Sequence, residues 1–173
     1  LRLIQRFIGT AIKISLRRDK EGKGDISQFG ALTTALAATI GTAAIENNLY
    51  LKQSEVHGMS QRGGAVQSHV RISDQPIYSD LIPQGKADII ISVEPMELLR
   101  YLPYLKKDGY LITDSNPFEN ISNYPELDAV YDEIKSHKNH ILIDAMKIAK
   151  RSGHAGADVL RLCQHPDLKA LVV

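Results

Sequence analysis

The sequence predicts an α/β protein in which strands and helices alternate to build a largely parallel, doubly wound sheet. The run Ala87–Val93 is almost wholly apolar, as in a strand that is covered on both faces. In the stretch Ala65–Ile72 the apolar residues share one parity, as in a strand with one buried face. The stretch Glu126–His137 instead has apolar residues at helical spacing. This alternation of element types is typical of parallel sheets flanked by helices.

The first part of the chain predicts a basic amphipathic helix. Leu1–Arg18 combines apolar residues at helical spacing with five Arg and Lys residues, and Asp19–Gly24 is a charged, glycine-containing linker. Such a helix either lies on a membrane surface or packs as a terminal helix. We therefore divide the chain into a helix and linker (residues 1–24) and an α/β domain (residues 25–173).

Asp25 is a suitable N-cap for a long helix from Ile26 to Asn47. The stretch from Ile26 to Ile45 contains no charged residue, and as a helix it would be long enough to span a bilayer. Because its residues are mostly Ala, Thr, Ser and Gly, the composition favours a buried core helix over a membrane span.

The remaining elements follow from local patterns. Pro95 suits the first turn of a helix, and Pro103 is expected to end that helix early. The expected strands are Leu49–Val56, Ala65–Ile72, Ala87–Val93, Tyr110–Asp114 and His140–Asp144; the expected helices are Met96–Leu105, Glu126–His137 and one starting at Ala145–Lys150.

Composition excludes several classes of function. A net charge of +1 gives no overall attraction to nucleic acid or membrane, and the single cysteine, Cys163, allows neither an internal disulfide nor an iron–sulfur cluster held by this chain alone. The sequence has no paired CxxC motifs, no P-loop and no GxGxxG. No secretory signal is recognisable, so we expect a cytoplasmic protein.

The turn between the first two strands of the α/β region is the main candidate site. It is polar and glycine-rich: its candidate residues are His57, Gly58, Ser60, Gln61, Arg62, Gly63 and Gly64. Arg62 offers a planar fork for a carboxylate or phosphate, and the glycines permit close approach of a ligand. The alternative is a structural turn capped by Arg62. His57 and His69 would need a third ligand to hold a metal, so we predict no metal site.

Further candidates follow two strands of the predicted sheet. Glu94 comes directly after Ala87–Val93, and Asp114, Ser115 and Asn116 end or follow Tyr110–Asp114. Ligands of open α/β sheets bind at the carboxyl ends of strands, so we expect these residues to line a cleft.

The run SEVHGMSQRGG (Ser54–Gly64) resembles the small subunit of indolepyruvate:ferredoxin oxidoreductase, within the gamma-type domain of the 2-oxoacid:acceptor oxidoreductases. The resemblance continues in Tyr78–Phe118 and His140–Lys150 and covers about residues 37–152. It implies a Rossmann-like sheet. The family's first strand and its GVGGQG-type loop have no counterpart in this sequence, so we expect a sheet without them and an impaired or inactive subunit. The sheet then exposes an edge and an apolar face unless Leu1–Ser15 or Ala170–Val173 takes the place of the strand.

The same resemblance implies a division of labour between subunits. Thiamine diphosphate and iron–sulfur clusters belong to the large subunit, while the small subunit completes the active-site cleft and has no catalytic residue or bound cofactor of its own. Partners are then the large subunit, the 2-oxoacid and coenzyme A, with ferredoxin acting indirectly. In this assignment Arg62 pairs with an anionic group of the substrate or coenzyme A, and Gln61 and Ser60 donate hydrogen bonds.

The two ends of the chain resemble other families, which makes the sequence look like a mosaic. Residues 1–41 resemble sodium:alanine symporters, through GDISQFGALTTALAATIGT, and residues 153–173 resemble N-acetyl-gamma-glutamyl-phosphate reductases. Two alternative functions follow: a membrane-associated fragment governed by the first 45 residues, and a nucleotide-binding reductase fragment acting through the tail.

Overall fold

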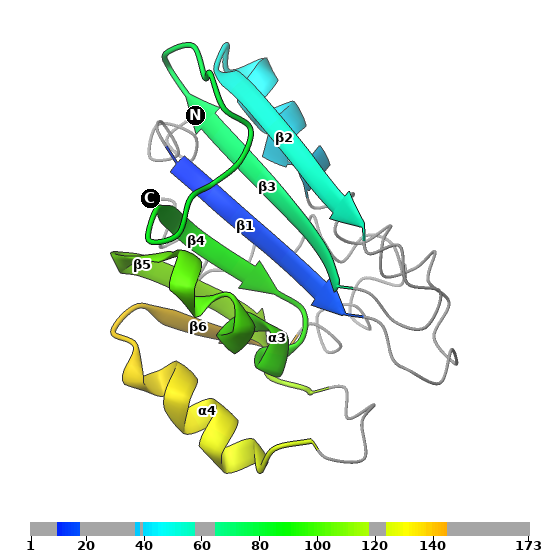
Figure 1. Ribbon diagram of the computed structural model, residues 1–173, viewed down its shortest axis with the longest axis vertical. Helices are drawn as coiled ribbons and strands as arrows, with labels where there is room; N and C mark the ends of the chain where they lie inside the picture. Colours follow the sequence, from blue (N-terminus) through cyan, green and yellow to red (C-terminus); the bar gives the residue numbers. More distant parts are fainter. Residues whose placement is uncertain (1–9, 18–36, 39, 58–64, 118–123, 145–173) are drawn as a thin grey trace.

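The computed structural model describes residues 10–17, 37–38, 40–57, 65–117 and 124–144, and these build one six-stranded sheet (Figure 1). Its spatial order is β2-β3-β1-β4-β5-β6. The strands are β1 (Thr10–Arg17), β2 (Tyr50–His57), β3 (Ala65–Ser73), β4 (Ala87–Ser92), β5 (Leu105–Asp114) and β6 (His140–Ile143). The helices are α3 (Pro95–Arg100), the 3-10 helix η1 (Leu102–Tyr104) and α4 (Leu127–Ser136). The predicted α/β fold is confirmed.

The sheet has a parallel part and an antiparallel part that meet at β1. Strand β1 runs parallel to β4, and the β4–β5 and β5–β6 pairs are also parallel. On its other side β1 is antiparallel to β3, which forms an antiparallel hairpin with β2. In Figure 1 the arrowheads of β1, β2 and β4 therefore point the same way and that of β3 points back.

The prediction of a basic amphipathic helix at the start of the chain is wrong for the residues of β1. Residues Thr10–Arg17 form a strand between β3 and β4, whereas a helix was expected throughout Leu1–Arg18. The sequence TAIKISLR also alternates, with Ile12, Ile14 and Leu16 on one parity. The apolar residues thus fit both a helical spacing and the alternation of a strand. The segment becomes a strand because two flanking strands can pair with it, and such tertiary contacts override local helical spacing. Residues 1–9 lie outside the described part.

The same strand takes the place of the family's first strand, as the alternative with Leu1–Ser15 as the substitute allowed. The missing family segment leaves no gap, because Thr10–Arg17 occupies the middle of the sheet. It also joins the N-terminal segment to the α/β domain, so the expected boundary at residue 24 does not separate a helix from the sheet. The place that the family's Gly-rich loop would take falls among residues outside the described part.

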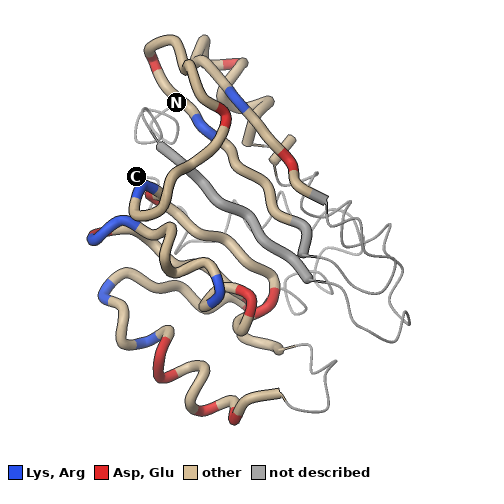
Figure 2. The backbone as a smooth tube through the Cα atoms, viewed as in Figure 1, with Lys and Arg blue, Asp and Glu red and all other residues tan. Residues whose placement is uncertain are grey.

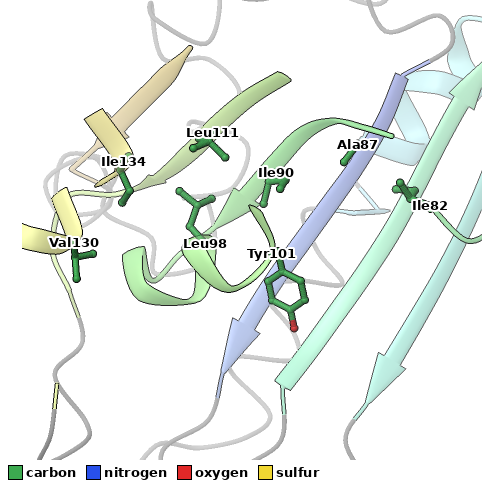
Figure 3. Close-up of a cluster of buried hydrophobic side chains, with 8 residues drawn as sticks. All are labelled: Ile82, Ala87, Ile90, Leu98, Tyr101, Leu111, Val130 and Ile134. Atoms are coloured by element: carbon green, nitrogen blue, oxygen red, sulfur yellow. The ribbon is translucent and has the colours of Figure 1, made fainter. Parts of the chain in front are cut away.

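Helices cover both faces of the sheet, which makes the fold doubly wound. On one face Leu98 of α3 and Val130 and Ile134 of α4 pack with Ile90 and Leu111 of the sheet (Figure 3). On the other face helical residues in 37–46 contribute Ala37 and Ala44, which pack with apolar residues of β3, β4, β5 and β6: Val70, Ile72, Ile91, Ile112 and Ile143. Two apolar clusters thus sandwich the sheet.

The connection after β4 shows how proline shapes the chain. Pro95 lies in the first turn of α3, where its missing N–H costs nothing, and α3 ends at Arg100. Pro103 lies in η1, so the helix expected over Met96–Leu105 ends early, as predicted. α4 and β6 also lie where the sequence predicts them.

The helix expected over Ile26–Asn47 is described only in part: residues 37–38 and 40–46 are helical. The expected helix at Ala145–Lys150 and the whole C-terminal tail lie outside the described residues. Among the residues that the structure describes, no helix is both long and apolar enough to cross a membrane.

Candidate functional site at the carboxyl edge of the sheet

The register of the strands brings five strand ends to one edge of the sheet, which we call the carboxyl edge. Ser92 at the end of β4 pairs with Ser15 of β1 and Thr113 of β5, and Asp114 pairs with Ile143 at the end of β6. The last residue of β1, Arg17, pairs with Ala65, where β3 begins. β2 also ends here, because His57 pairs with Val66. The turn between β2 and β3 therefore leaves and re-enters the sheet at the carboxyl edge.

Six of the seven turn candidates lie outside the described residues. These are Gly58, Ser60, Gln61, Arg62, Gly63 and Gly64, while His57 is described only as the last residue of β2. Their grouping into a site stays a prediction. The described strands support one part of it, since both anchors of the turn lie at the edge where open α/β sheets bind ligands.

Glu94 is held by two partners just beyond β4. One carboxylate oxygen, Oε2, accepts a hydrogen bond from the backbone N–H of Glu97 at 2.9 Å and so caps α3. The other, Oε1, accepts a short hydrogen bond from the Tyr124 hydroxyl. Burial raises the pKa of Glu94 above its usual value, and the bonds from Tyr124 and from backbone N–H groups only partly oppose this effect.

Tyr124 is a site residue that the sequence did not reveal. It lies shortly before α4, thirty positions from its partner Glu94. Burial, together with the neighbouring carboxylate of Glu94, raises the pKa of Tyr124, so its hydroxyl stays protonated and acts as a donor. The pair joins the end of β4 to the segment that enters α4. No local pattern signals such a contact, because it depends on how two distant segments approach one another.

Asn116 bridges two carboxylates at the ends of β5 and β6. Its side-chain Nδ2 donates to Asp114 Oδ1 at 3.0 Å and to Asp144 Oδ1 at 3.1 Å. The backbone N–H of Asn116 also donates to Asp114 Oδ1 at 2.9 Å. Asp114 is buried, whereas Asp144 is exposed. Asp144 directly follows the end of β6, as Asp114 ends β5. Its position at a strand end was the signal that could have added Asp144 to the candidates.

Ser115 contributes through its backbone. Its N–H donates to the carbonyl of Ile143 at 2.8 Å, and its own carbonyl accepts from the Tyr131 hydroxyl at 2.8 Å. These bonds fasten the turn after β5 to β6 and α4. The four secondary candidates thus lie at one edge, as expected, but in two groups: Glu94 with Tyr124, and Asp114, Ser115 and Asn116 with Asp144.

The chemistry of the described part of the edge is acidic. Glu94, Asp114 and Asp144 supply carboxylates there, and Glu97 follows at the start of α3; Figure 2 shows the acidic stretch where β4 leads into α3. Carboxylates repel a second anion at short range. An anionic ligand at this edge would therefore need a cation beside it, and Arg17, the last residue of β1, lies at the same edge. Among the described residues, no group of three or more His, Cys, Asp or Glu side chains could hold a metal ion.

The chain is similar to proteins of one enzyme family over most of its length. Residues 29–161 match the family model described as pyruvate ferredoxin/flavodoxin oxidoreductase. The indolepyruvate oxidoreductase subunit IorB of Pyrococcus horikoshii is 38% identical over 133 residues, which is 72% of this chain and 64% of that protein. The chain therefore spans less than two thirds of the length of this relative. The predicted resemblance to the indolepyruvate oxidoreductase small subunit is confirmed.

A structural comparison gives the same fold. The pyruvate oxidoreductase subunit PORC of Thermotoga maritima matches with a TM-score of 0.56 at 15% identity, covering 93% of this chain and 78% of that one. A separate, short similarity links 40 residues, at 55% identity, to an uncharacterized transporter of Haemophilus influenzae; they make up 23% of this chain and 9% of that protein. The expected mosaic organisation stays a prediction. Because the family model matches well over half of the chain, this protein belongs to the pyruvate ferredoxin/flavodoxin oxidoreductase family.

Proposed function

We propose that this chain is the small subunit of an indolepyruvate-type 2-oxoacid:ferredoxin oxidoreductase. The observation that carries the proposal is the 38% identity with a protein named as an indolepyruvate oxidoreductase subunit. In this role the chain completes an active-site cleft whose thiamine diphosphate and iron–sulfur clusters belong to a large partner subunit. The single Cys163 supports this division, because four thiolates are the usual ligands of a cluster.

The turn between β2 and β3 is the part of the chain that we assign to the cleft. Its two anchors, His57 and Ala65, lie at the carboxyl edge. The described side of that edge carries carboxylates, whereas a 2-oxoacid and coenzyme A are both anions. Arg62 is the residue of the turn that can supply a compensating cation, and its guanidinium can bind a carboxylate or phosphate with two hydrogen bonds. Gln61 and Ser60 would add donors.

The missing Gly-rich loop bears on activity. Backbone N–H groups of such loops commonly bind anions, and this sequence has no loop of that kind after β1. We therefore expect the subunit to support a lower turnover than a small subunit that has the loop, with an inactive assembly as the extreme case.

The experiment is a reconstitution with the thiamine-binding large subunit. The two chains are co-purified, and reduction of a dye is followed after addition of indolepyruvate and coenzyme A. We expect dye reduction that needs both chains and the 2-oxoacid. A small subunit that never co-purifies with the large one would disprove the assignment.

Arg62→Ala tests the turn in the same assay. Loss of one desolvated, bidentate ion contact costs about 2–5 kcal/mol, which lowers kcat/KM roughly 30-fold or more. Arg62→Lys keeps the charge but loses the planar fork, so an intermediate loss is expected. Lys107→Ala, which removes an exposed cation from β5, serves as the control and should leave kcat/KM unchanged. Unchanged turnover in Arg62→Ala would remove Arg62 from the site.

A further inference from the structure

We propose that β2 is a self-association edge, through which two copies of this chain join their sheets into one continuous sheet. The proposal is independent of the function proposed above. It rests on the position of β2 in the sheet, on the side chains exposed along it, and on the register in which this strand can pair with itself.

β2 lies at the end of the strand order, so in the described part of the chain only one of its two edges is paired. Its pairing with β3 continues without a register break from Tyr50 to His57. Proteins usually protect such an edge with a proline, a bulge or several charges, because unpaired N–H and C=O groups recruit another strand. β2 has no proline and no bulge, and its charged side chains are those of Lys52 and Glu55.

Exposed apolar side chains occur at both ends of β2 and in the helical segment before it. Tyr50 is 51% exposed and Val56 is 42% exposed, one at each end of β2, and Ile45 of the preceding helical segment is 63% exposed. That segment packs over β2, because a Cβ built on Gly41 would lie 2.8 Å from Leu51 Cδ2. Large apolar side chains near an open strand edge are the feature that a partner would bury.

The alternation of side chains selects the register. In an antiparallel pair of identical strands, opposite residues lie on the same face of the sheet, so their numbers have the same parity. The register centred on Gln53 places Gln53 opposite itself, Lys52 opposite Ser54, Leu51 opposite Glu55 and Tyr50 opposite Val56. It therefore pairs the two exposed apolar residues of each strand with each other, and aromatic–β-branched pairs stabilise antiparallel sheets.

Neighbouring registers are worse. Centring the pair on Lys52 places two ammonium groups directly opposite one another, which is unfavourable. Centring it on Ser54 places Lys52 opposite Val56 and leaves Tyr50 without a partner in β2. The favoured occupant of the edge is thus a second copy of this chain, in the register centred on Gln53.

Sedimentation of the full chain tests the association. We expect the wild-type protein to sediment with twice the mass of the single chain, and Val56→Asp to raise the dissociation constant at least 10-fold. Leu81→Asp is the matched control: Leu81 is 52% exposed but lies in the connection between β3 and β4, so this variant should remain a dimer. A monomeric wild-type protein, or a Val56→Asp protein that still dimerises like Leu81→Asp, would overturn the proposal.

Disulfide trapping tests the register without relying on a destabilising variant. In a Cys163→Ser background, Gln53→Cys places two thiols opposite each other with Cα atoms about 5 Å apart, within the range for a disulfide. Lys52→Cys moves the Cα atoms beyond about 7 Å, so it should cross-link far more slowly. Equal rates would contradict the register. If Val56→Asp instead abolishes co-purification with the large subunit without changing the mass of the isolated chain, the edge belongs to that subunit and the proposal is wrong.

Discussion

Glu94 shows how a single half-buried carboxylate links the end of a strand to two other segments. Its two oxygens accept from the backbone of Glu97 and from the hydroxyl of Tyr124. Both bonds stabilise the ionised carboxylate, yet burial outweighs them and the pKa of Glu94 lies above its usual value. A group with a raised pKa is protonated more readily in the folded state than in the unfolded state.

This shift predicts a pH dependence of stability. Because the folded pKa of Glu94 exceeds the unfolded value of 4.5, its favourable contribution is complete below pH 4.5 and is lost as the pH rises through the folded pKa. Glu94→Gln cannot ionise. The difference in free energy of unfolding between Glu94→Gln and the wild type should therefore move in favour of the variant as the pH rises from 4.5 to 7.

Denaturant unfolding at several pH values measures this difference. Glu126→Gln, at an exposed position before α4, is the control for loss of a negative charge. A difference between Glu94→Gln and the wild type that stays constant across this pH range would show that Glu94 has no raised pKa in the folded protein.

A second residue-scale prediction concerns neighbouring hydroxyls at the carboxyl edge. Thr113 and Ser92 face each other across β5 and β4, and both are buried. Among the described residues the Thr113 hydroxyl has no hydrogen-bond partner, whereas the Ser92 hydroxyl donates to the carbonyl of Glu94 at 2.8 Å. Thr113→Val should raise the free energy of unfolding by about 1 kcal/mol, because it removes an unsatisfied polar group and keeps the shape.

Ser92→Ala is the matched variant, for which the free energy of unfolding should change in the opposite direction. It leaves the groups that bond to the Ser92 hydroxyl without their partner, so it should lower the free energy of unfolding by about 1 kcal/mol. Chemical denaturation of the two variants provides the comparison. A destabilised Thr113→Val protein would mean that this hydroxyl has a partner in solution.

At the scale of elements, β1 decides how the sheet is built. Its residues pair with β3 on one side and with β4 on the other, and it is the only described strand whose two neighbours run in opposite directions. The sequence around it fits a helical period through Leu1, Ile4 and Ile8 and a strand period through Ile12 and Ile14. Local pattern could not choose between them, since the choice depends on β3 and β4, which lie far along the chain.

Ile14→Pro tests the strand directly. Ile14 pairs with Ser68 of β3 and with Ile91 of β4, so it lies in the middle of the sheet. Proline removes a backbone donor and is rarely tolerated in a central strand, so we expect loss of about 3 kcal/mol or more and of cooperative unfolding. Ile14→Val, which preserves strand propensity, should unfold cooperatively. Thermal denaturation followed by circular dichroism distinguishes the two; a cooperative Ile14→Pro protein would argue against a central β1.

Other elements could be predicted because their signals are local. β4 is an apolar run, α4 has a clear helical period, and the early end of α3 follows from Pro103. The strand ends also predicted that Glu94 and Asp114 lie at one edge. The pairing of Glu94 with Tyr124 could not be predicted, because a hydroxyl's position depends on how the segment before α4 packs.

At the scale of the whole molecule, the described sheet unites segments that resemble different families. The sequence predicts that β1 lies in a symporter-like stretch, which stays a prediction, whereas β2 to β6 lie within the part that matches the oxidoreductase family model. Hydrogen bonds between backbones do not depend on side-chain identity, so a segment of another origin can complete a sheet if its length and alternation suit the place. The absence of the family's strand from the sequence therefore leaves no gap in the described sheet, because Thr10–Arg17 pairs with β3 and β4.

The central place of β1 has a consequence for biosynthesis. On the ribosome this strand emerges first, but β3 and β4, which flank it, are translated much later. The β2–β3 hairpin, whose strands are close in sequence, is complete while β4 is still being made. β1 therefore has to wait without its neighbours, and the parallel and antiparallel parts of the sheet can be joined only after the codons for β4 have been read.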